Sequence, residues 1–369
     1  MKIGFDAKRA FLNSSGLGNF SRNTLKALHQ YFPDNHYVLF TPEINKELFP
    51  QYKEFDVISP DSPMSKIFKS LWRSFSVSRQ LKNKELDIFH GLSNELPAGI
   101  HKTNVPSVVT IHDLIFMWFP EFYKTIDRNI YYQKVKYACG AATKIHAISH
   151  RTKEDIVTFF NTEPEKIEVI HQSVPPLFFE IQNTEKLLKK YEMPEEFILS
   201  VGTIEQRKNQ LSLLKAVHAA NIKTAVVFVG NLTSYSEELL KFISENNLDN
   251  QVKFLSNIPR TDLTGLYQSA ILSVYISLFE GFGLPIIESM ASGCPVITSN
   301  ISCLAETASD AAILCNPQNF EEIGAAIKKL TEDKKEREKY IQRGRERAKD
   351  FHPAGFSEKM ISLYSQILS

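Results

Sequence analysis

Short runs of β-branched and aromatic residues alternate along the chain with amphipathic helical patterns. In the first half, the patterns at 19–32 and 127–142 predict helices. The runs between such helices are apolar enough to be strands buried on both faces of a sheet: KIGFDA (2–7), YVLFT (37–41), DIFHGL (87–92), SVVTIHDL (107–114), KIHAIS (144–149) and IEVIHQ (167–172). This alternation predicts repeated βα units and an α/β fold built on parallel sheets.

The series of strands breaks at residues 175–196, which are rich in proline and charge, and then restarts. The later strand-like runs are FILSVGTI (197–204), TAVVFVGN (224–231), QVKFLSN (251–257), AILSVYIS (270–277) and CPVITSN (294–300). We therefore predict two Rossmann-like, doubly wound domains, residues 1–178 and residues 179–352. The segment 353–369 is expected to be a helix that crosses back onto the first domain, with the apolar stripe Phe356, Met360, Leu363, Tyr364 and Ile367.

Composition excludes several classes of protein. A formal charge of +1 over 369 residues gives no electrostatic drive toward nucleic acid. The four cysteines are scattered without a C-x-x-C pair, and the start MKIGFDAKRAFL does not have the pattern of a secretion signal, which indicates free thiols in a reducing cytoplasm. No run of about 18 apolar residues occurs, so we expect a cytoplasmic protein without a transmembrane span.

The stretch EGFGLPIIESMASG (280–293) carries two glutamates on either side of a glycine turn. A strand-like run precedes it, and Pro285 and Gly293 mark the start and the stop of a helix. The turn therefore lies at the carboxyl end of a strand, where open α/β sheets bind ligands, and its N–H groups and the helix dipole suit a phosphate. Carboxylates only accept hydrogen bonds, so hydroxyls are natural partners for Glu280, at the end of the strand, and for Glu288, near the first helical turn. Hydroxyls at both ends of a ligand with phosphates between them describe a sugar nucleotide.

This stretch resembles the E-x7-E signature of retaining glycosyltransferases of the GT-B fold, in family four of the bacterial sugar transferases. The resemblance implies that Glu280 holds the hydroxyls of the donor sugar and acts in catalysis, and that Glu288 binds the ribose of the nucleotide. It also implies a donor-binding loop formed by Gly281, Phe282, Gly283 and Leu284. The ordinary alternative is a βα turn whose glutamates cap or solvate a helix.

SVGTIEQRKN (200–209) repeats the arrangement of a strand followed by glycine and is similar to the family's donor-phosphate loop. Gly202 forms the turn, and Arg207 and Lys208 fall where the family has the cations that neutralise the diphosphate. Fixed cations stabilise a leaving group that gains negative charge. The alternative is a solvated surface pair.

Two further segments of the first half resemble parts of the family. Gly16 and Gly18 stand in a predicted loop before a helix, similar to the family's glycine loop; as a dinucleotide fingerprint the segment fails, because Ser21 replaces the third glycine. His112, at the end of a strand, matches the family's acceptor-side histidine, with a buried histidine bonded to backbone as the alternative. His90 and Asn94 lie at another strand end with less specificity.

Between Pro63 and Lys84 the chain has six basic residues and no acidic one: Lys66, Lys69, Arg73, Arg79, Lys82 and Lys84. Apolar residues recur beside them at helical spacing, so the segment could lie on an anionic bilayer at the inner face of the membrane and bring the enzyme to a lipid-linked acceptor. We favour the alternative of an ordinary helix that packs on the first sheet. No D-x-D and no His/Cys cluster with metal-ligand spacing occurs, so no metal and no cofactor is predicted.

The sequence therefore predicts a GT-B enzyme of two Rossmann-like domains facing a cleft. Its reaction would move a hexosyl unit, with retention and without a metal, from a nucleotide sugar to a glycan or lipid-linked acceptor of surface polysaccharide. The segments VGTIEQRKN and FDAKR are similar to those of O-antigen and capsule mannosyltransferases, which favours GDP-mannose and leaves UDP-sugars open. The competing hypotheses are a sugar-nucleotide epimerase of GT-B architecture and a non-catalytic protein that binds sugar nucleotides.

Overall fold

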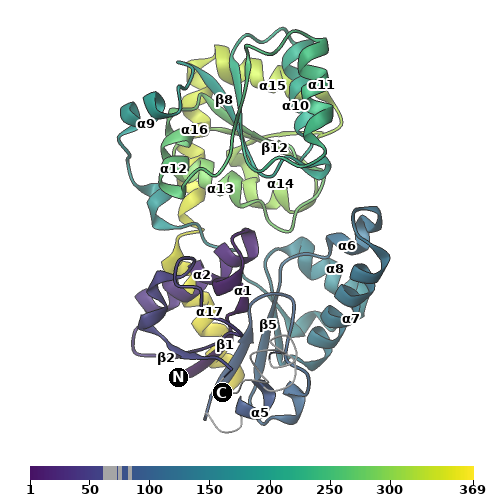
Figure 1. Ribbon diagram of the computed structural model, residues 1–369, viewed down its shortest axis with the longest axis vertical. Helices are drawn as coiled ribbons and strands as arrows, with labels where there is room; N and C mark the ends of the chain where they lie inside the picture. Colours follow the sequence, from purple (N-terminus) through teal and green to yellow (C-terminus); the bar gives the residue numbers. More distant parts are fainter. Residues whose placement is uncertain (61–72, 74–76, 82–84) are drawn as a thin grey trace. The chain divides into compact units, whose positions relative to one another are not determined.

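The computed structural model describes residues 1–60, 73, 77–81 and 85–369. The chain forms two compact units: unit 1 comprises residues 1–173 and 353–369, and unit 2 comprises residues 174–352 (Figure 1). The boundary predicted from the sequence, after residue 178, lies a few residues further along, inside the short 3-10 helix η6 (Pro176–Phe179). Residues 174–178 thus belong to unit 2.

The described residues of unit 1 form a seven-stranded parallel sheet with the strand order β3-β2-β1-β4-β5-β6-β7. Its strands are β1 (Lys2–Asp6), β2 (His36–Phe40), β3 (Asp56–Ile58), β4 (Ile88–Gly91), β5 (Ser107–Ile111), β6 (Lys144–Ala147) and β7 (Ile167–Val169). Its helices are α1 (Lys8–Leu12), α2 (Gly16–Tyr31), α5 (Val77–Leu81), α6 (Ile115–Trp118), α7 (Thr125–Ala141), α8 (His150–Phe160) and α17 (Pro353–Leu368). Short 3-10 turns are η1 (Pro50–Glu54), η3 (Ile100–Lys102), η4 (Pro120–Phe122) and η5 (Pro164–Lys166).

Unit 2, described continuously from residue 174 to residue 352, holds a six-stranded parallel sheet with the order β10-β9-β8-β11-β12-β13. Its strands are β8 (Phe197–Val201), β9 (Ala225–Val229), β10 (Val252–Leu255), β11 (Leu272–Tyr275), β12 (Val296–Ser299) and β13 (Ile313–Cys315). Its α-helices are α9 (Thr184–Lys190), α10 (Gln210–Ala219), α11 (Ser236–Glu245), α12 (Arg260–Ser269), α13 (Leu284–Ala291), α14 (Ser302–Ala308), α15 (Phe320–Glu332) and α16 (Lys334–Lys349). Besides η6, two 3-10 turns are η7 (Gln206–Lys208) and η8 (Ser309–Ala311).

Both sheets are doubly wound, as predicted. In each, the strand order reverses next to the first strand of the unit, between β1 and β4 in unit 1 and between β8 and β11 in unit 2. Successive connections leave such a point toward opposite faces of the sheet, and ligands of this fold class bind at the carboxyl ends of the strands beside it. The topology therefore places one candidate site in each unit.

The last helix, α17, is part of unit 1 and packs against α2 (Figure 1). Phe356, Met360, Leu363 and Tyr364 of its predicted stripe are buried in the same apolar cluster as Phe5 of β1. The segment reaches unit 1 only after the chain has built unit 2, so unit 1 is completed by the end of the chain.

A chain of buried hydrogen bonds ties α17 to the sheet. His146 Nε2 donates to the carbonyl of Ile170 at 2.7 Å, because a carbonyl can only accept. His146 Nδ1 then accepts from Thr110 Oγ1 at 3.0 Å, and Thr110 Oγ1 accepts from His90 Nε2 at 2.8 Å. His90 Nδ1 in turn accepts from the hydroxyl of Tyr364 at 2.6 Å. His90 is thus a structural residue of the core, not a ligand-facing one.

The basic segment 63–84 lies mostly outside the described residues. Arg73 is described, and it is buried, with Nε and Nη2 on Asp6 Oδ2 at 2.7 Å each and Nη1 on Glu95 Oε2 at 2.5 Å. Asp6 ends the central strand β1 and Glu95 follows β4, so Arg73 is held at the carboxyl ends of the central strands, is not available to lipid headgroups, and the membrane hypothesis loses this cation. Across the described residues, no helix combines the length and the apolar character that crossing a membrane requires.

Candidate active site

Two loops of unit 2 meet where its strand order reverses. One follows β8 and carries Gly202, Arg207 and Lys208; the other follows β11 and carries Glu280. Gly202 has a φ of +148°, a backbone conformation that residues other than glycine rarely adopt. The N–H of Leu278 donates to the carbonyl of Arg207 at 2.8 Å, which joins the two loops through their backbones.

The side chains of these loops form an ionic cluster. Glu280 Oε1 accepts from Lys208 Nζ at 2.6 Å and lies 2.7 Å from Arg207 Nη1. Arg207 Nη1 also donates to the carbonyl of Phe279 at 2.7 Å. The structure thus brings together three of the residues that the sequence predicted to act in catalysis, Glu280, Arg207 and Lys208.

The charges of this cluster support one another. Burial alone would raise the pKa of Glu280, but the charges of Lys208 and Arg207 and their hydrogen bonds lower it to about 2. Burial lowers the pKa of Lys208, and Glu280 opposes that shift. Glu280 is therefore a carboxylate at neutral pH and accepts hydrogen bonds only.

The loop after β11 ends in the N-terminus of α13. Gly281 and Phe282 form a bend, Gly283 caps the helix with a φ of +102°, and Leu284 is its first residue. The carbonyl of Glu280 accepts from Cys303 Sγ at 3.0 Å, and the carbonyl of Phe282 accepts from Thr307 Oγ1 at 2.7 Å. These bonds from α14 hold the loop, so the positive end of the α13 dipole lies next to the ionic cluster.

Glu288 lies one turn further into α13 than the sequence suggested, in the second turn of the helix. Its carboxylate is buried and accepts from Arg260 Nη2, at the start of α12, at 2.8 Å. The guanidinium of Arg260 lies over the ring of Phe178, 5.7 Å from its centroid. No sequence pattern pointed to Arg260, because an ion pair between residues 28 positions apart leaves no local signal.

Two more residues that sequence reasoning missed hold the cluster in place. Asn209 has a φ of +59°, and its Nδ2 donates to the carbonyls of Ile276 and Pro317, at 3.2 and 2.7 Å. It thereby fastens η7 to the end of β11. The hydroxyl of Tyr275 accepts from Lys208 Nζ at 2.5 Å, and Nζ lies 4.8 Å from the centroid of the Tyr275 ring. The available sequence signal for Asn209 was an asparagine, a residue that tolerates a positive φ, directly after the basic pair.

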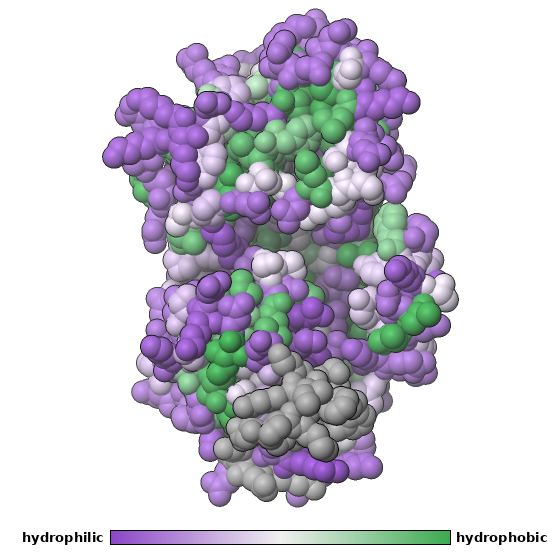
Figure 2. Space-filling model, viewed as in Figure 1, coloured by the Kyte–Doolittle hydropathy of each residue, from purple (hydrophilic) through white to green (hydrophobic). Residues whose placement is uncertain are grey.

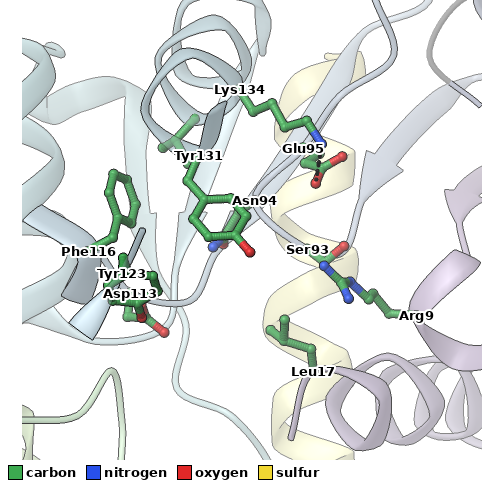
Figure 3. Close-up of a pocket in the computed structure, with 11 residues that line it drawn as sticks. Arg9, Leu17, Ser93, Asn94, Glu95, Asp113, Phe116, Tyr123, Tyr131 and Lys134 are labelled. Atoms are coloured by element: carbon green, nitrogen blue, oxygen red, sulfur yellow. Dashed lines mark hydrogen bonds and ion pairs between the residues drawn. The ribbon is translucent and has the colours of Figure 1, made fainter. Parts of the chain in front are cut away.

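Unit 1 has a cavity of about 200 Å³ at the carboxyl ends of its central strands (Figure 3). Arg9 follows β1, Asn94 and Glu95 follow β4, and Asp113 follows β5. Figure 3 shows the aromatic side chains on one side of the cavity and Arg9 on the other. The lining consists of Arg9, Leu17, Ser93, Asn94, Glu95, Asp113, Phe116, Tyr123, Tyr131, Lys134 and Val135. Aromatic faces beside amides and carboxylates suit a ligand with both apolar and hydroxyl surfaces, such as a sugar.

Exposed apolar side chains continue from this cavity along α7. Tyr131 lines the cavity. Ile126, five residues before it in α7, is 75% exposed, and Ile130, directly before it, is 45% exposed. Figure 2 shows that hydrophilic side chains cover most of the visible surface and that apolar ones form several patches, one of them on the right over the region of α6 and α7. The cavity thus opens beside an apolar strip.

His112 is placed beside the cavity but is buried. Its Nε2 donates to the carbonyl of Leu92 at 2.8 Å, and its backbone N–H donates to Asn94 Oδ1 at 2.8 Å. Burial lowers the pKa of His112 to about 4, so the ring is neutral and Nδ1 carries the lone pair. This geometry agrees with the alternative of a buried histidine bonded to backbone, and a contact with the acceptor stays a prediction.

The prediction that Gly16 and Gly18 stand in a loop before a helix was wrong. Both residues belong to the first turn of α2 itself. Asn13 Oδ1 accepts from the N–H groups of Ser15 and Gly18, at 2.9 and 3.2 Å, and so caps the helix. A Cβ on Gly18 would come within 1.7 Å of the Asn13 carbonyl oxygen. Close backbone packing therefore accounts for Gly18, and contact of either glycine with a donor stays a prediction.

Both halves of the chain match known family models. Residues 183–347 match the model described as glycosyl transferases group 1, and residues 14–176 match the model described as glycosyltransferase family 4. The two matches fall on the two Rossmann-like units described above, one on each.

Individual relatives agree with these models. The O-antigen chain mannosyltransferase B of Escherichia coli is 29% identical over 285 residues, which cover 75% of this chain and 74% of that protein. The O-antigen chain mannosyltransferase RfbU of Salmonella typhimurium is 30% identical over 223 residues, 60% of either chain. Among solved structures, Anabaena Alr3699/HepE in complex with UDP-glucose superposes with a TM-score of 0.78, at 17% identity, over 99% of this chain and 100% of that chain. At this identity the structural likeness shows the fold.

Proposed function

The chain belongs to family 4, group 1, of the glycosyltransferases and has their GT-B fold, and from this premise we propose that it moves a hexosyl unit from a nucleotide sugar to a glycan or lipid-linked acceptor. The relatives named above support a part in the biosynthesis of surface polysaccharide. In this proposal unit 2 binds the donor and unit 1 binds the acceptor.

One observation carries the assignment of the donor site: a buried carboxylate and two cations meet beside a helix N-terminus, where the strand order reverses. Arg207, Lys208 and the N–H groups of residues 281–284 would bind the diphosphate, which takes negative charge as it leaves. Glu280 would accept hydroxyls of the sugar, and Glu288 those of the ribose. With cations and a helix dipole at this position, departure of the diphosphate would need no metal.

The family retains anomeric configuration, and we propose the same outcome here. Departure of the diphosphate would leave an oxocarbenium-like centre, which the acceptor hydroxyl attacks from the same face while an oxygen of the leaving group takes its proton. Double displacement would need a carboxylate free to attack the anomeric carbon. Glu280 is held by Lys208 and Arg207, which supports a hydroxyl-binding task over a nucleophilic one.

The relatives favour mannose as the transferred sugar. Both O-antigen relatives named above are mannosyltransferases, so we propose GDP-mannose as the donor. The complex of Anabaena Alr3699/HepE with UDP-glucose keeps a UDP-sugar as the alternative.

The cavity of unit 1 supports an acceptor that carries sugar. Tyr131 and Phe116 would stack on apolar sugar faces, and Asn94 would meet hydroxyls. The apolar strip at Ile126 and Ile130 would suit the lipid part of a lipid-linked acceptor. Through its Nδ1 atom, His112 would contact the acceptor or the transferred sugar.

The proposal is tested by thermal unfolding of the purified protein with GDP-mannose, GDP, UDP-glucose and UDP. A true donor at 100 times its dissociation constant adds about 2.7 kcal/mol of stability, which raises the melting temperature by several degrees. Lys208→Met should abolish the shift, whereas Lys215→Met, an exposed lysine of α10 in the same unit, should keep it. If none of these nucleotides stabilises the protein, the donor site is wrong. Release of nucleotide that depends strictly on an acceptor distinguishes transfer from epimerisation.

A further inference from the structure

A second carboxylate shares Arg207 with Glu280. Glu205 lies between β8 and η7, and its Oε1 accepts from Arg207 Nη2 at 2.5 Å, while Glu280 holds Nη1 of the same guanidinium. The two carboxylates differ in their access to water, since the side chain of Glu205 is 35% exposed and that of Glu280 is 11% exposed. Glu205 can therefore turn away into solvent, and Glu280 cannot.

The cluster is electrically neutral. Glu205 and Glu280 carry two negative charges, and Arg207 and Lys208 carry two positive ones. A nucleoside diphosphate brings several negative charges to a site whose cations already have partners at 2.5 to 2.7 Å. A diphosphate on Arg207 would bring further negative charge close to the Glu205 carboxylate, so the two anions would compete for the same guanidinium.

We propose that Glu205 is an affinity-setting residue that occupies Arg207 when the donor site is empty and gives way to the diphosphate when it fills. Glu280 and the carbonyl of Phe279 hold only Nη1 of this little-exposed guanidinium, and Glu205 provides the partner of Nη2 in the empty site. When the sugar has been transferred, the same carboxylate competes with the nucleoside diphosphate for Arg207 and speeds its release. This inference rests on the proposed function and adds to it a residue that weakens the binding of product.

The test is a gain of affinity. In Glu205→Gln the amide keeps the size of the side chain and removes its charge, so the dissociation constant of GDP should fall by roughly three- to tenfold. The matched control is Glu196→Gln, at the amino end of the same strand β8, where an exposed glutamate changes the net charge equally but lies away from Arg207. Affinities are measured by calorimetry with GDP and UDP, and folding is checked by the melting temperature of each variant.

Kinetics give a second measurement. Glu205→Gln should lower the KM for the donor, strengthen inhibition by the nucleoside diphosphate and lower kcat if release limits turnover. A purely structural role would weaken binding instead, so weaker or unchanged affinity in Glu205→Gln overturns the inference while the donor site stands. If the wild type binds neither GDP nor UDP, or if Arg207→Met binds them as tightly as the wild type does, the proposed function itself fails. A variant that melts well below the wild type and binds more weakly also counts against the inference.

Discussion

The chemistry of the site depends on Glu280, a buried residue whose charge is maintained by its neighbours. Burial works against its carboxylate, and Lys208 and Arg207 reverse that effect and bring its pKa to about 2. The same contacts orient its oxygens, since Oε1 is shared by both cations. A group that is fixed in charge and in place suits the binding of hydroxyls in a transition state, because it needs no reorganisation at the moment of reaction.

Replacing Glu280 by glutamine separates these effects. Glu280→Gln keeps the shape of the side chain but gives up a charged acceptor, so we expect kcat to fall by at least about 100-fold. Binding of GDP should be retained or become tighter, because Arg207 and Lys208 lose a competing negative charge. Steady-state kinetics and calorimetry on the same preparation measure both quantities. Turnover at the wild-type rate, or loss of GDP binding together with activity, would contradict the role given to Glu280.

At the scale of elements, the start of α13 is a tightly constrained part of the proposed donor site. Gly283 caps the helix with a φ of +102°, and a Cβ there would come within 2.6 Å of Leu304 Cδ2 on α14. The conformation favours glycine, and a Cβ would in addition have to displace the end of the Leu304 side chain. A shift of α13 would move Leu284 and the N–H groups that are proposed to meet the diphosphate.

We therefore expect Gly283→Ala to destabilise unit 2 by about 1 to 3 kcal/mol and to weaken binding of the nucleotide. The control is Gly355→Ala in the first turn of α17, where a Cβ would meet nothing within 4 Å. There alanine should leave stability unchanged or raise it by up to about 1 kcal/mol. Urea unfolding of both variants measures the difference. Equal stability of the two variants would show that the α13 cap is not strained as described.

How far the sequence predicts an element depends on how local its signal is. Runs rich in β-branched and aromatic residues predicted the central strands, and Pro285 and Gly293 predicted the helix α13 between β11 and β12. The edge strands β3 and β13, of three residues each, were missed, whereas β7, equally short, was found because it lies in the apolar run IEVI. Gly16 was taken for a loop residue because glycine is a poor helix former, yet the Asn13 cap starts α2 at Gly16. Within the site, Glu280, Arg207 and Lys208 stand in local motifs, whereas Arg260 is defined only by tertiary contact.

At the scale of the whole molecule, unit 1 depends on the end of the chain for part of its core. The buried series of Tyr364, His90, Thr110 and His146 runs from α17 across three strands, and the Nδ1 atoms of His90 and His146 each accept a hydrogen bond, which requires both rings to be neutral. Protonation of either ring would turn its Nδ1 into a donor, so the hydroxyl opposite it would have to reverse and its present hydrogen bond would be lost. The attachment of α17 should therefore weaken in acid.

The stability of unit 1 should fall as the pH drops through the range in which its buried histidines titrate. Burial lowers the pKa of His112 and of His146 to about 4, and lowers that of His90 well below its usual range. An unfolded histidine has a pKa of about 6.5, so the unfolded state binds more protons between these values. Stability is then full above about pH 6.5 and is lost as the pH falls toward about 4, by roughly 1.4 kcal/mol per unit for each histidine. Glu95, whose pKa is lowered by Arg73 and Lys134 against the effect of burial, adds to the loss only below its usual range. Burial raises the pKa of Asp155, so this carboxylate takes up its proton more readily in the folded state and opposes the loss.

Urea unfolding followed by tryptophan fluorescence measures this loss, since both tryptophans of the chain, Trp72 and Trp118, fall within residues 1–173. The free energy of unfolding at pH 5.0 should lie several kcal/mol below its value at pH 7.5. His146→Gln provides the control, because an amide at this position does not titrate and the slope between pH 5 and pH 6.5 should become shallower by one histidine's share. An unfolding free energy that is the same at both pH values would mean that the three rings are not held neutral in the folded protein, and that the direction assigned to their hydrogen bonds is wrong.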